Sequence, residues 1–202
     1  GKRANKKALQ EELGFEGDDK VMLAGFIARL ADQKGLSLIV EGFEKMMGLP
    51  LQFVLQGVGD PRYERRFKGL AKDYPSNFSA QIKFDKILAK KIYAAADLFF
   101  IPSRFEPCGL TQMIAMRYGT LPLARATGGL NDSINDGEDG FTFEKYEVGQ
   151  MTACLRRALK IFGKPSWKEM IRKAMAKDFS WEKSAREYIA LYERAVEYAK
   201  KG

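Results

Sequence analysis

The chain has 202 residues, 46% of them apolar and 30% charged, and its 14 Phe, 8 Tyr and 2 Trp indicate a globular domain rather than a disordered segment. It contains no histidine, which excludes a Ser-His-Asp triad, a histidine general base and a histidine-bound metal assembled from this chain alone. The net charge is +8, and the apolar runs are too short to cross a bilayer, so no membrane partner is expected.

The predicted elements alternate between helices and strands along the chain. A helix over residues 6–13 ends at Gly14. Apolar and β-branched runs then predict six strands, at residues 21–27, 51–55, 78–82, 97–101, 120–123 and 140–143. Amphipathic segments predict helices at residues 35–47, 61–74, 86–95, 110–118 and 131–135, followed by three more at 148–162, 166–177 and 181–200. This alternation indicates an α/β fold, a Rossmann-like doubly wound parallel sheet in one domain over residues 1–202.

Glycine, charged and aromatic residues follow five predicted strands in succession. In a doubly wound sheet, ligands lie beyond the carboxyl ends of the strands, so these residues predict a single binding rim. They are Arg29 and Lys34 after the first strand, Gly57 and Gly59 after the second, Phe84 after the third, residues 103–111 after the fourth and residues 126–130 after the fifth.

Three features of this rim suit a nucleotide. Arg29 and Lys34 can neutralise a diphosphate, although both could also be ordinary surface cations. The segment at residues 109–111 opens a helix, where free backbone N–H groups either bind an anion or only cap the helix. Phe84 is either an aromatic platform for a base or a residue of the core.

Other rim residues have simpler explanations. Glu106 lies in an Arg-Phe-Glu-Pro loop, where a salt bridge to Arg104 would account for it. Gly57 and Gly59 fit a tight turn and lack the third glycine of a dinucleotide-binding fingerprint. Cys108 has no histidine beside it to act as a base, which disfavours a nucleophilic role.

Charge and cysteine usage bear on partners and compartment. Eight basic residues and one acidic residue lie between positions 155 and 177, spaced as on the solvated outer face of helices, and an anionic or polysaccharide partner is the alternative. No aromatic platforms interleave with these charges, which disfavours nucleic acid. Cys108 and Cys154 show neither zinc spacing nor a disulfide framework, and no signal peptide is evident, so a reducing compartment is expected.

Three motifs resemble one family of enzymes. They are Pro-Ser-Arg-Phe-Glu-Pro-Cys-Gly-Leu-Thr-Gln at residues 102–112, Ala-Met-Arg-Tyr-Gly-Thr-Leu-Pro-Leu at 115–123 and Ala-Thr-Gly-Gly-Leu-Asn-Asp at 126–132. Together with Arg-Leu-Ala-Asp-Gln-Lys-Gly at 29–35 and Phe-Ser-Trp at 179–181, they resemble the C-terminal half of bacterial glycogen synthases and plant-type starch synthases. The likeness runs from about residue 5 to residue 192.

The resemblance implies the donor-binding half of a two-domain GT-B fold, without the N-terminal acceptor-binding domain. Such enzymes transfer glucose from ADP-glucose to the non-reducing end of an α-1,4-glucan with retention of configuration, and they need no metal or other cofactor. The isolated domain is then expected to be inactive, and the helix over residues 181–200 to lack the first domain on which it packs. The compartment would be the cytoplasm in a bacterium or the plastid stroma in a plant or alga.

The resemblance also implies roles for individual residues. Arg29 and Lys34 would hold the diphosphate and stabilise its charge as it leaves, so that these two and Glu106 are the expected catalytic residues. The sugar hydroxyls would contact Glu106 and the backbone of Cys108 and Gly109. The nucleotide would contact Phe84 through its adenine, and Leu110 and Thr111 through its phosphates.

Several features depart from the family's pattern or leave its reading open. Lys90 stands where the family often has a histidine, and Ile114 where many related retaining enzymes have a second glutamate. The family's N-terminal Lys-x-Gly-Gly-Leu motif is absent. The alternatives are a half of another GT-B glycosyltransferase or of a sugar-nucleotide epimerase, or a stand-alone nucleotide-binding module, and the choice between ADP and UDP stays open.

Overall fold

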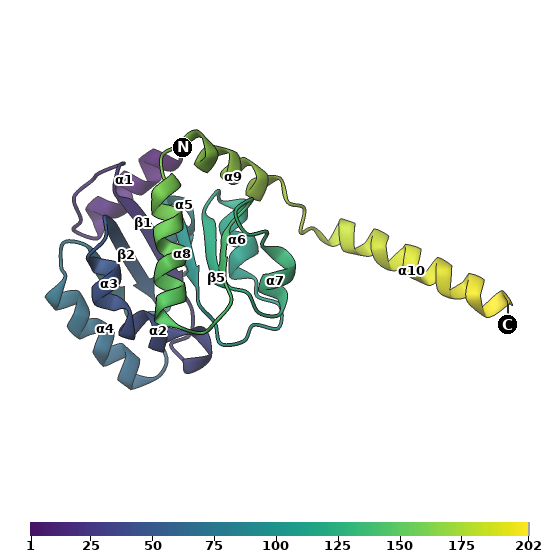
Figure 1. Cartoon of the computed structure of the whole chain (residues 1–202), viewed down its shortest axis with the longest axis horizontal. Coiled ribbons are helices and arrows are strands. Elements are labelled where there is room, and N and C mark those ends of the chain that lie inside the picture. Colours follow the sequence, from purple (N-terminus) through teal and green to yellow (C-terminus); the bar gives the residue numbers. More distant parts are fainter. Residues whose placement is uncertain (202) are drawn as a thin grey trace.

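A single parallel sheet organises the chain, whose computed structural model describes residues 1–201. Its six strands have the spatial order β3-β2-β1-β4-β5-β6 and all neighbouring pairs are parallel (Figure 1). The strands are β1 Met22–Ile27, β2 Leu51–Gln56, β3 Phe78–Gln81, β4 Leu98–Ile101, β5 Leu121–Arg125 and β6 Phe141–Phe143. The reversal of strand order between β1 and β4 is that of a doubly wound Rossmann-like sheet, which confirms the predicted fold class.

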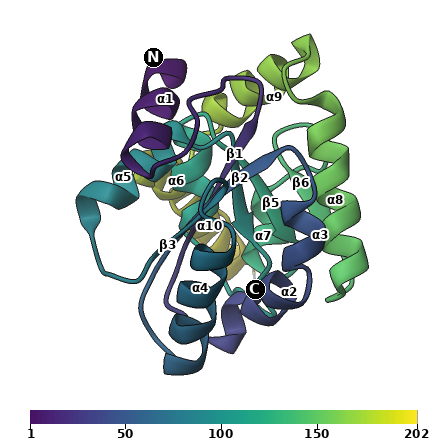
Figure 2. The same cartoon turned by 90° about the vertical axis from the view of Figure 1, so that its left-hand side faces the viewer.

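Helices cover both faces of the sheet (Figure 2). One group of helices in mutual contact contains α1, α5, α6 and α9, and α2 and α8 pack together on the other side. The helices are α1 Lys2–Glu12, a short 3-10 helix Asp32–Lys34, α2 Leu36–Glu41, α3 Phe43–Met47, α4 Pro61–Asp73, α5 Lys86–Ala95, α6 Thr111–Arg117, α7 Gly129–Ser133, α8 Val148–Ile161, α9 Pro165–Ala176 and α10 Trp181–Lys201.

The core lies where the central strands are covered on both faces. Every residue of β2 and β4 is buried, as expected for strands in the middle of a parallel sheet. Aromatic rings join the layers: Phe53 lies 5.5 Å from both Phe78 and Phe100, and Phe43 of α3 meets Phe78 edge-on at 4.8 Å. These contacts hold the carboxyl ends of the strands on a rigid base.

Three predicted helices differ from the structure by more than one residue at an end or by an internal break. The helix predicted over 35–47 is divided at Gly42, where the backbone leaves helical geometry with a φ of −89° and a ψ of 1°. The first helix begins at Lys2 rather than Lys6. The helix predicted over 131–135 is found at Gly129–Ser133, so the Gly-Gly pair belongs to its start.

α10 extends away from the rest of the molecule (Figure 1). Its aromatic and aliphatic side chains are exposed, among them Trp181 at 85% and Tyr192 at 63%. The motif residues at its start and along its length therefore contact little of the domain described here. The expectation that this helix packs little against the rest of the chain is confirmed.

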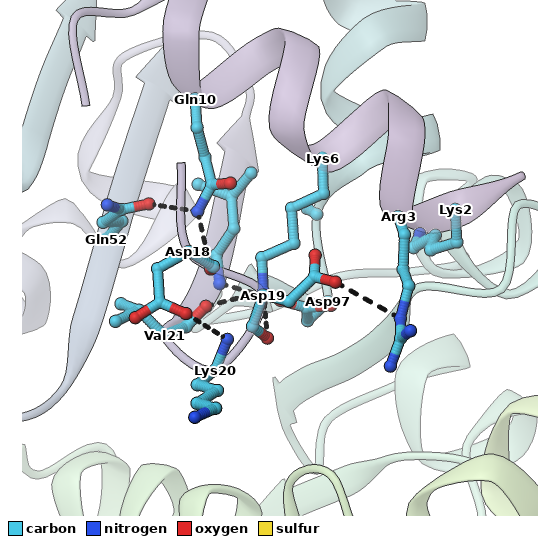
Figure 3. Close-up of polar contacts among 12 residues, drawn as sticks. Lys2, Arg3, Lys6, Gln10, Asp18, Asp19, Lys20, Val21, Gln52 and Asp97 are labelled. Carbon is cyan, nitrogen blue, oxygen red and sulfur yellow. Dashed lines mark hydrogen bonds and ion pairs between the residues drawn. The ribbon is translucent and has the colours of Figure 1, made fainter. Parts of the chain in front are cut away.

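A buried polar cluster ties α1 to the amino edge of the sheet (Figure 3). The ammonium group of Lys6, whose side chain is only 3% exposed, lies 2.7 Å from a carboxylate oxygen of Asp97. Lys6 also donates to the Val21 carbonyl at 2.6 Å, and Asp97 accepts from the Leu23 N–H at 2.9 Å. The pair thus joins α1 to the segments that begin β1 and β4.

A second lysine of α1 gives a testable pH dependence. Lys2 is half-buried and donates to the carbonyls of Tyr93 and Tyr118 and to the Thr120 hydroxyl. Burial lowers the pKa of Lys2 to about 8. The unfolded chain keeps the ordinary lysine value, so between these two values it binds more protons than the folded protein, and raising the pH favours folding.

Relative to Lys2→Met, which cannot titrate, the wild-type chain is expected to gain roughly 1–2 kcal/mol of stability as the pH rises from about 7 to 10. Urea denaturation of both proteins across that range measures the difference. A difference that stays flat or falls with pH would contradict the burial of a charged amine.

Candidate nucleotide-binding site

A cavity of about 410 Å³ opens at the carboxyl ends of β1, β2 and β3. Arg29, Gly57 and Phe84 are among the residues that line it. Arg29 is exposed and forms no ion pair within residues 1–201. Phe84 is 78% exposed, so its interpretation as a core residue is wrong. The cavity therefore offers one free guanidinium group and one aromatic face.

A smaller recess continues this site toward β4. It shares Ile27 and Ala28 with the larger cavity and is lined by Lys34, Glu106 and Thr111. The Lys34 ammonium lies 2.6 Å from a Glu106 carboxylate oxygen, which also accepts from the Ser103 hydroxyl at 3.1 Å. The structure thus brings together two residues separated by 72 positions, and the expected alternative, a salt bridge from Glu106 to Arg104, is wrong.

Close backbone packing positions Lys34. The residue ends the short 3-10 helix after β1, and Gly35 follows it with a φ of +77°. A side chain at Gly35 would lie 1.9 Å from the carbonyl oxygen of Pro102, so only glycine allows this approach. The Arg104 N–H donates to the Gln33 carbonyl at 2.8 Å, which joins the loop after β1 to the loop after β4.

The loop that carries Glu106 is also held from the other side, by the start of α7. The Gly129 N–H donates to the carbonyls of Glu106 and Pro107 at 3.1 and 3.2 Å. A side chain at Gly128 would lie 2.3 Å from the Glu106 carbonyl oxygen, and one at Gly129 would lie 2.4 Å from that of Cys108. The Thr-Gly-Gly motif is therefore needed for close approach of two loops.

The remaining predicted residues line neither the recess nor, apart from Gly57, the larger cavity, and Leu110 lines a separate cavity with residues of α6 and residues 175–180. Gly109, with φ of +77°, precedes α6, which begins at Thr111 rather than at Leu110. Leu110 is 67% exposed, and Cys108 is an exposed free thiol. Gly57 and Gly59 pack against the backbone at Ala28 and Leu30, which supports their interpretation as a turn.

Three residues that position the site are missing from the sequence-based prediction: Gln112, Arg125 and Tyr146. Arg125 donates to the carbonyls of Ser103 and Arg104, and the guanidinium of Arg104 stacks over Tyr146 at 4.4 Å. Arg125 could have been predicted as a site residue, because it is a charged residue at the end of an otherwise buried strand. Nothing local indicated Tyr146, because its contacts come from other loops.

The basic residues at 156–177 lie on α8, in the loop between α8 and α9, on α9 and, for Lys177, directly after α9. Four of the eight form ion pairs: Arg157 with Asp136, Arg172 with Glu169, Lys173 with Glu138 and Lys177 with Asp139. This pairing favours their interpretation as a solvated helix surface. Lys90 is exposed on α5 and lines neither cavity.

The described residues form neither a membrane-spanning helix nor a cluster of metal ligands. Along residues 1–201, no helix combines the length and the apolar character that spanning a bilayer requires. The same part of the chain contains no group of three or more Cys, Asp or Glu side chains arranged to hold a metal ion.

Comparison with known proteins places this chain in a family. Residues 5–177 match the family described as "Glycosyl transferases group 1". The glycogen synthase of Kosmotoga olearia is 47% identical over 202 residues, and that of Thermosipho melanesiensis is 44% identical over 203 residues. Both matches cover 96% of this chain and 42% of the relative, so the chain spans less than half the length of these proteins.

Solved structures agree with the sequence relatives. The catalytic domain of starch synthase IV from Arabidopsis thaliana, bound to ADP and acarbose, superposes with a TM-score of 0.88 at 42% identity, over 97% of this chain and 43% of that one. The C-terminal domain of a group 1 family glycosyl transferase from Francisella tularensis has a TM-score of 0.69 at 18% identity, over 84% of this chain and 89% of that one, and shows the shared fold. On this basis the chain belongs to the group 1 glycosyl transferases.

Proposed function

We propose that this chain is the donor-binding domain of a glycogen or starch synthase, and that it binds ADP-glucose for retaining transfer of glucose to the non-reducing end of an α-1,4-glucan. The observation that carries the proposal is the continuous site in which the Arg29–Phe84 cavity adjoins the Lys34–Glu106 recess. The relatives named glycogen synthase, and the similar starch synthase structure bound to ADP, support it.

The two parts of the site suit the two ends of a nucleotide sugar. A base can stack on the exposed face of Phe84, and the guanidinium of Arg29 beside it is free to bind a diphosphate in a forked geometry. Glu106 lies in the recess next to Lys34, where a carboxylate can accept hydrogen bonds from sugar hydroxyls. The nucleotide would therefore lie across the ends of β1 and β2, with its sugar toward the loop after β4.

Lys34 and Arg29 supply the chemistry that the transfer needs. As the bond between glucose and the diphosphate breaks, negative charge develops on the leaving phosphate, and preset cations stabilise it. The Glu106 carboxylate holds the Lys34 ammonium in place before the donor arrives. Phosphate oxygens then add a second set of acceptors for the same ammonium group.

Calorimetry and NMR of the 202-residue chain test the binding role. ADP and ADP-glucose are expected to bind, and added salt is expected to weaken both because the contacts are partly exposed. Amide shifts should move at Arg29, Phe84 and residues 109–111. Shifts confined to the surface at 156–177 would contradict the proposal, and binding of UDP-N-acetylglucosamine without ADP would favour a sugar-nucleotide epimerase instead.

The chain by itself is expected to give no detectable elongation of maltooligosaccharides from ADP-glucose. Retaining transfer requires the acceptor hydroxyl and the leaving phosphate at near-attack distance on one face of the sugar. The proposed site is an open rim at the edge of one sheet, and water around the diphosphate screens the cations. A radiolabelled assay measures the transfer of glucose to maltooligosaccharides. A turnover of about 1 s⁻¹, within the ordinary enzyme range, would contradict the expectation.

A further inference from the structure

Gln112 is a fully buried polar residue beneath the loop that carries Glu106. It lies in the first turn of α6, and its side chain is 0% exposed. Its amide nitrogen Nε2 lies 3.0 Å from the carbonyl oxygens of both Cys108 and Gly109 and 3.2 Å from the Ser133 hydroxyl. Because all three neighbours are acceptors, or can act as one, the NH₂ group faces them and the orientation of the amide is determined.

These hydrogen bonds determine where the next two N–H groups point. In a planar trans peptide, the C=O of one residue and the N–H of the next point in opposite directions. Gln112 draws the carbonyls of Cys108 and Gly109 inward, so the N–H groups of Gly109 and Leu110 are directed away from Gln112. Neither N–H finds an acceptor within residues 1–201.

The backbone conformation makes the two N–H groups converge. Gly109 has a φ of +77°, and Leu110 follows it in the right-handed helical region. Successive residues of opposite hand form a concavity in which neighbouring N–H groups can share one anionic or polar oxygen. A side chain at Gly109 would lie 2.6 Å from Oε1 of Gln112, so the glycine and the glutamine amide occupy mutually dependent positions.

We propose that Gln112 is a positioning residue for the donor: it presents the N–H groups of Gly109 and Leu110 to the phosphate and sugar oxygens of ADP-glucose. The inference rests on the proposed function, because it takes the donor to lie in the Arg29–Phe84 cavity and over the mouth of the Lys34–Glu106 recess. Gln112 itself touches no ligand. The Oε1 atom of Gln112 accepts no hydrogen bond in the described part of the chain. The hydrogen bonds of this buried amide are therefore those that Nε2 donates.

The test compares two buried glutamines. Gln112→Met removes the amide at nearly constant volume, and Gln10→Met is the matched control. Gln10 is also 0% exposed, and its Nε2 donates to the Asp18 carbonyl at 3.1 Å, but it lies at the amino edge of the sheet (Figure 3). Both variants lose a buried amide that holds a loop carbonyl, so both are expected to melt at a lower temperature than the wild type.

Only Gln112→Met is expected to lose donor affinity, by at least about tenfold for ADP-glucose measured by calorimetry. Adenosine, which has no phosphate and probes only the Arg29–Phe84 cavity, should bind both variants as it binds the wild type. In amide NMR spectra, ADP-glucose should shift the Gly109 and Leu110 resonances of the wild type and of Gln10→Met. The same shifts should be lost in Gln112→Met.

Gln112→Glu adds a pH readout and decides the question should Gln112→Met be too unstable to assay. A protonated carboxyl group can donate one hydrogen bond to the same carbonyls, and burial beside carbonyl oxygens favours the protonated form. Compared with the wild type at each pH, donor affinity should be close to normal at pH 5 and lost at pH 9. Normal affinity at both values would contradict the positioning role.

The two proposals fail in different ways. A wild-type chain that binds neither ADP nor ADP-glucose would contradict the proposed function, and the inference with it. A wild-type chain that binds ADP-glucose, with Gln112→Met binding it as tightly as Gln10→Met does, would contradict the inference alone.

Discussion

Replacement of Arg29 with alanine is expected to weaken ADP binding by about 1.5–3 kcal/mol, which is tenfold or more in affinity. Arg29 is exposed at the cavity and has no acidic partner within residues 1–201, so its whole charge is available to a ligand. The same absence of partners means that Arg29→Ala should leave the free energy of unfolding almost unchanged. Isothermal calorimetry with ADP and urea denaturation measure the two effects separately.

Lys34→Ala is expected to weaken ADP binding to a similar extent but to behave differently in stability. The lysine is the ion-pair partner of Glu106, whose side chain is only 11% exposed. Removing the ammonium leaves that carboxylate without its cation, and this costs stability in the free protein. The pair of variants therefore separates loss of a ligand contact from loss of a structural contact.

Arg156→Ala is the matched control for both variants. Arg156 is exposed on α8, away from the strand ends, so its loss lowers the net charge by the same amount without touching the site. If Arg156→Ala weakened ADP binding as much as Arg29→Ala, the effect would come from the overall charge of the chain. Unchanged affinity in both Arg29→Ala and Lys34→Ala would refute the assignment of the diphosphate to these residues.

Replacement of Lys6 with methionine is expected to destabilise the fold by about 3–5 kcal/mol, because it leaves the buried Asp97 carboxylate without its cation. Asp97, labelled with Lys6 in Figure 3, is 8% exposed, and the only other donor to it within residues 1–201 is the Leu23 N–H. The free energy of unfolding of a domain of this size is about 5–15 kcal/mol, so the loss is a large fraction of its stability. Urea denaturation followed by circular dichroism measures it.

The same helix provides the control. Lys7 forms an exposed pair with Glu11 at 3.8 Å, and Lys7→Met is expected to change stability by less than about 1 kcal/mol. The double variant with Lys6→Met and Asp97→Asn should recover part of the loss, because the unpaired charge is then removed. A Lys6→Met protein as stable as Lys7→Met would show that the buried pair contributes little.

Lys6→Met also tests whether the stability of the fold and the affinity for ADP are independent of each other. The buried pair lies before β4, and the recess with Glu106 lies after it. Molecules of the variant that remain folded should therefore bind ADP with wild-type affinity.

The sequence by itself determined the type and order of the elements. Strands such as Leu98–Ile101 are apolar throughout, and helices such as Pro61–Asp73 begin with an Asp cap and a proline, so each type follows from residues within a few positions of one another. The rule that ligands lie beyond parallel strand ends then placed Arg29, Lys34 and Glu106 on one rim. The structure places Lys34 and Glu106 in contact there.

Only the tertiary structure decided which side chains meet. Lys34 rather than Arg104 pairs with Glu106, because the packing of Gly35 against Pro102 brings the loop after β1 against the loop after β4. The Lys6–Asp97 pair and the hydrogen bond from Gln112 to Ser133 depend in the same way on residues distant in sequence. Local spacing specifies backbone conformation, whereas the partner of a charged or amide side chain depends on how closely two separate backbones approach, and that distance is set by the packing of the whole domain.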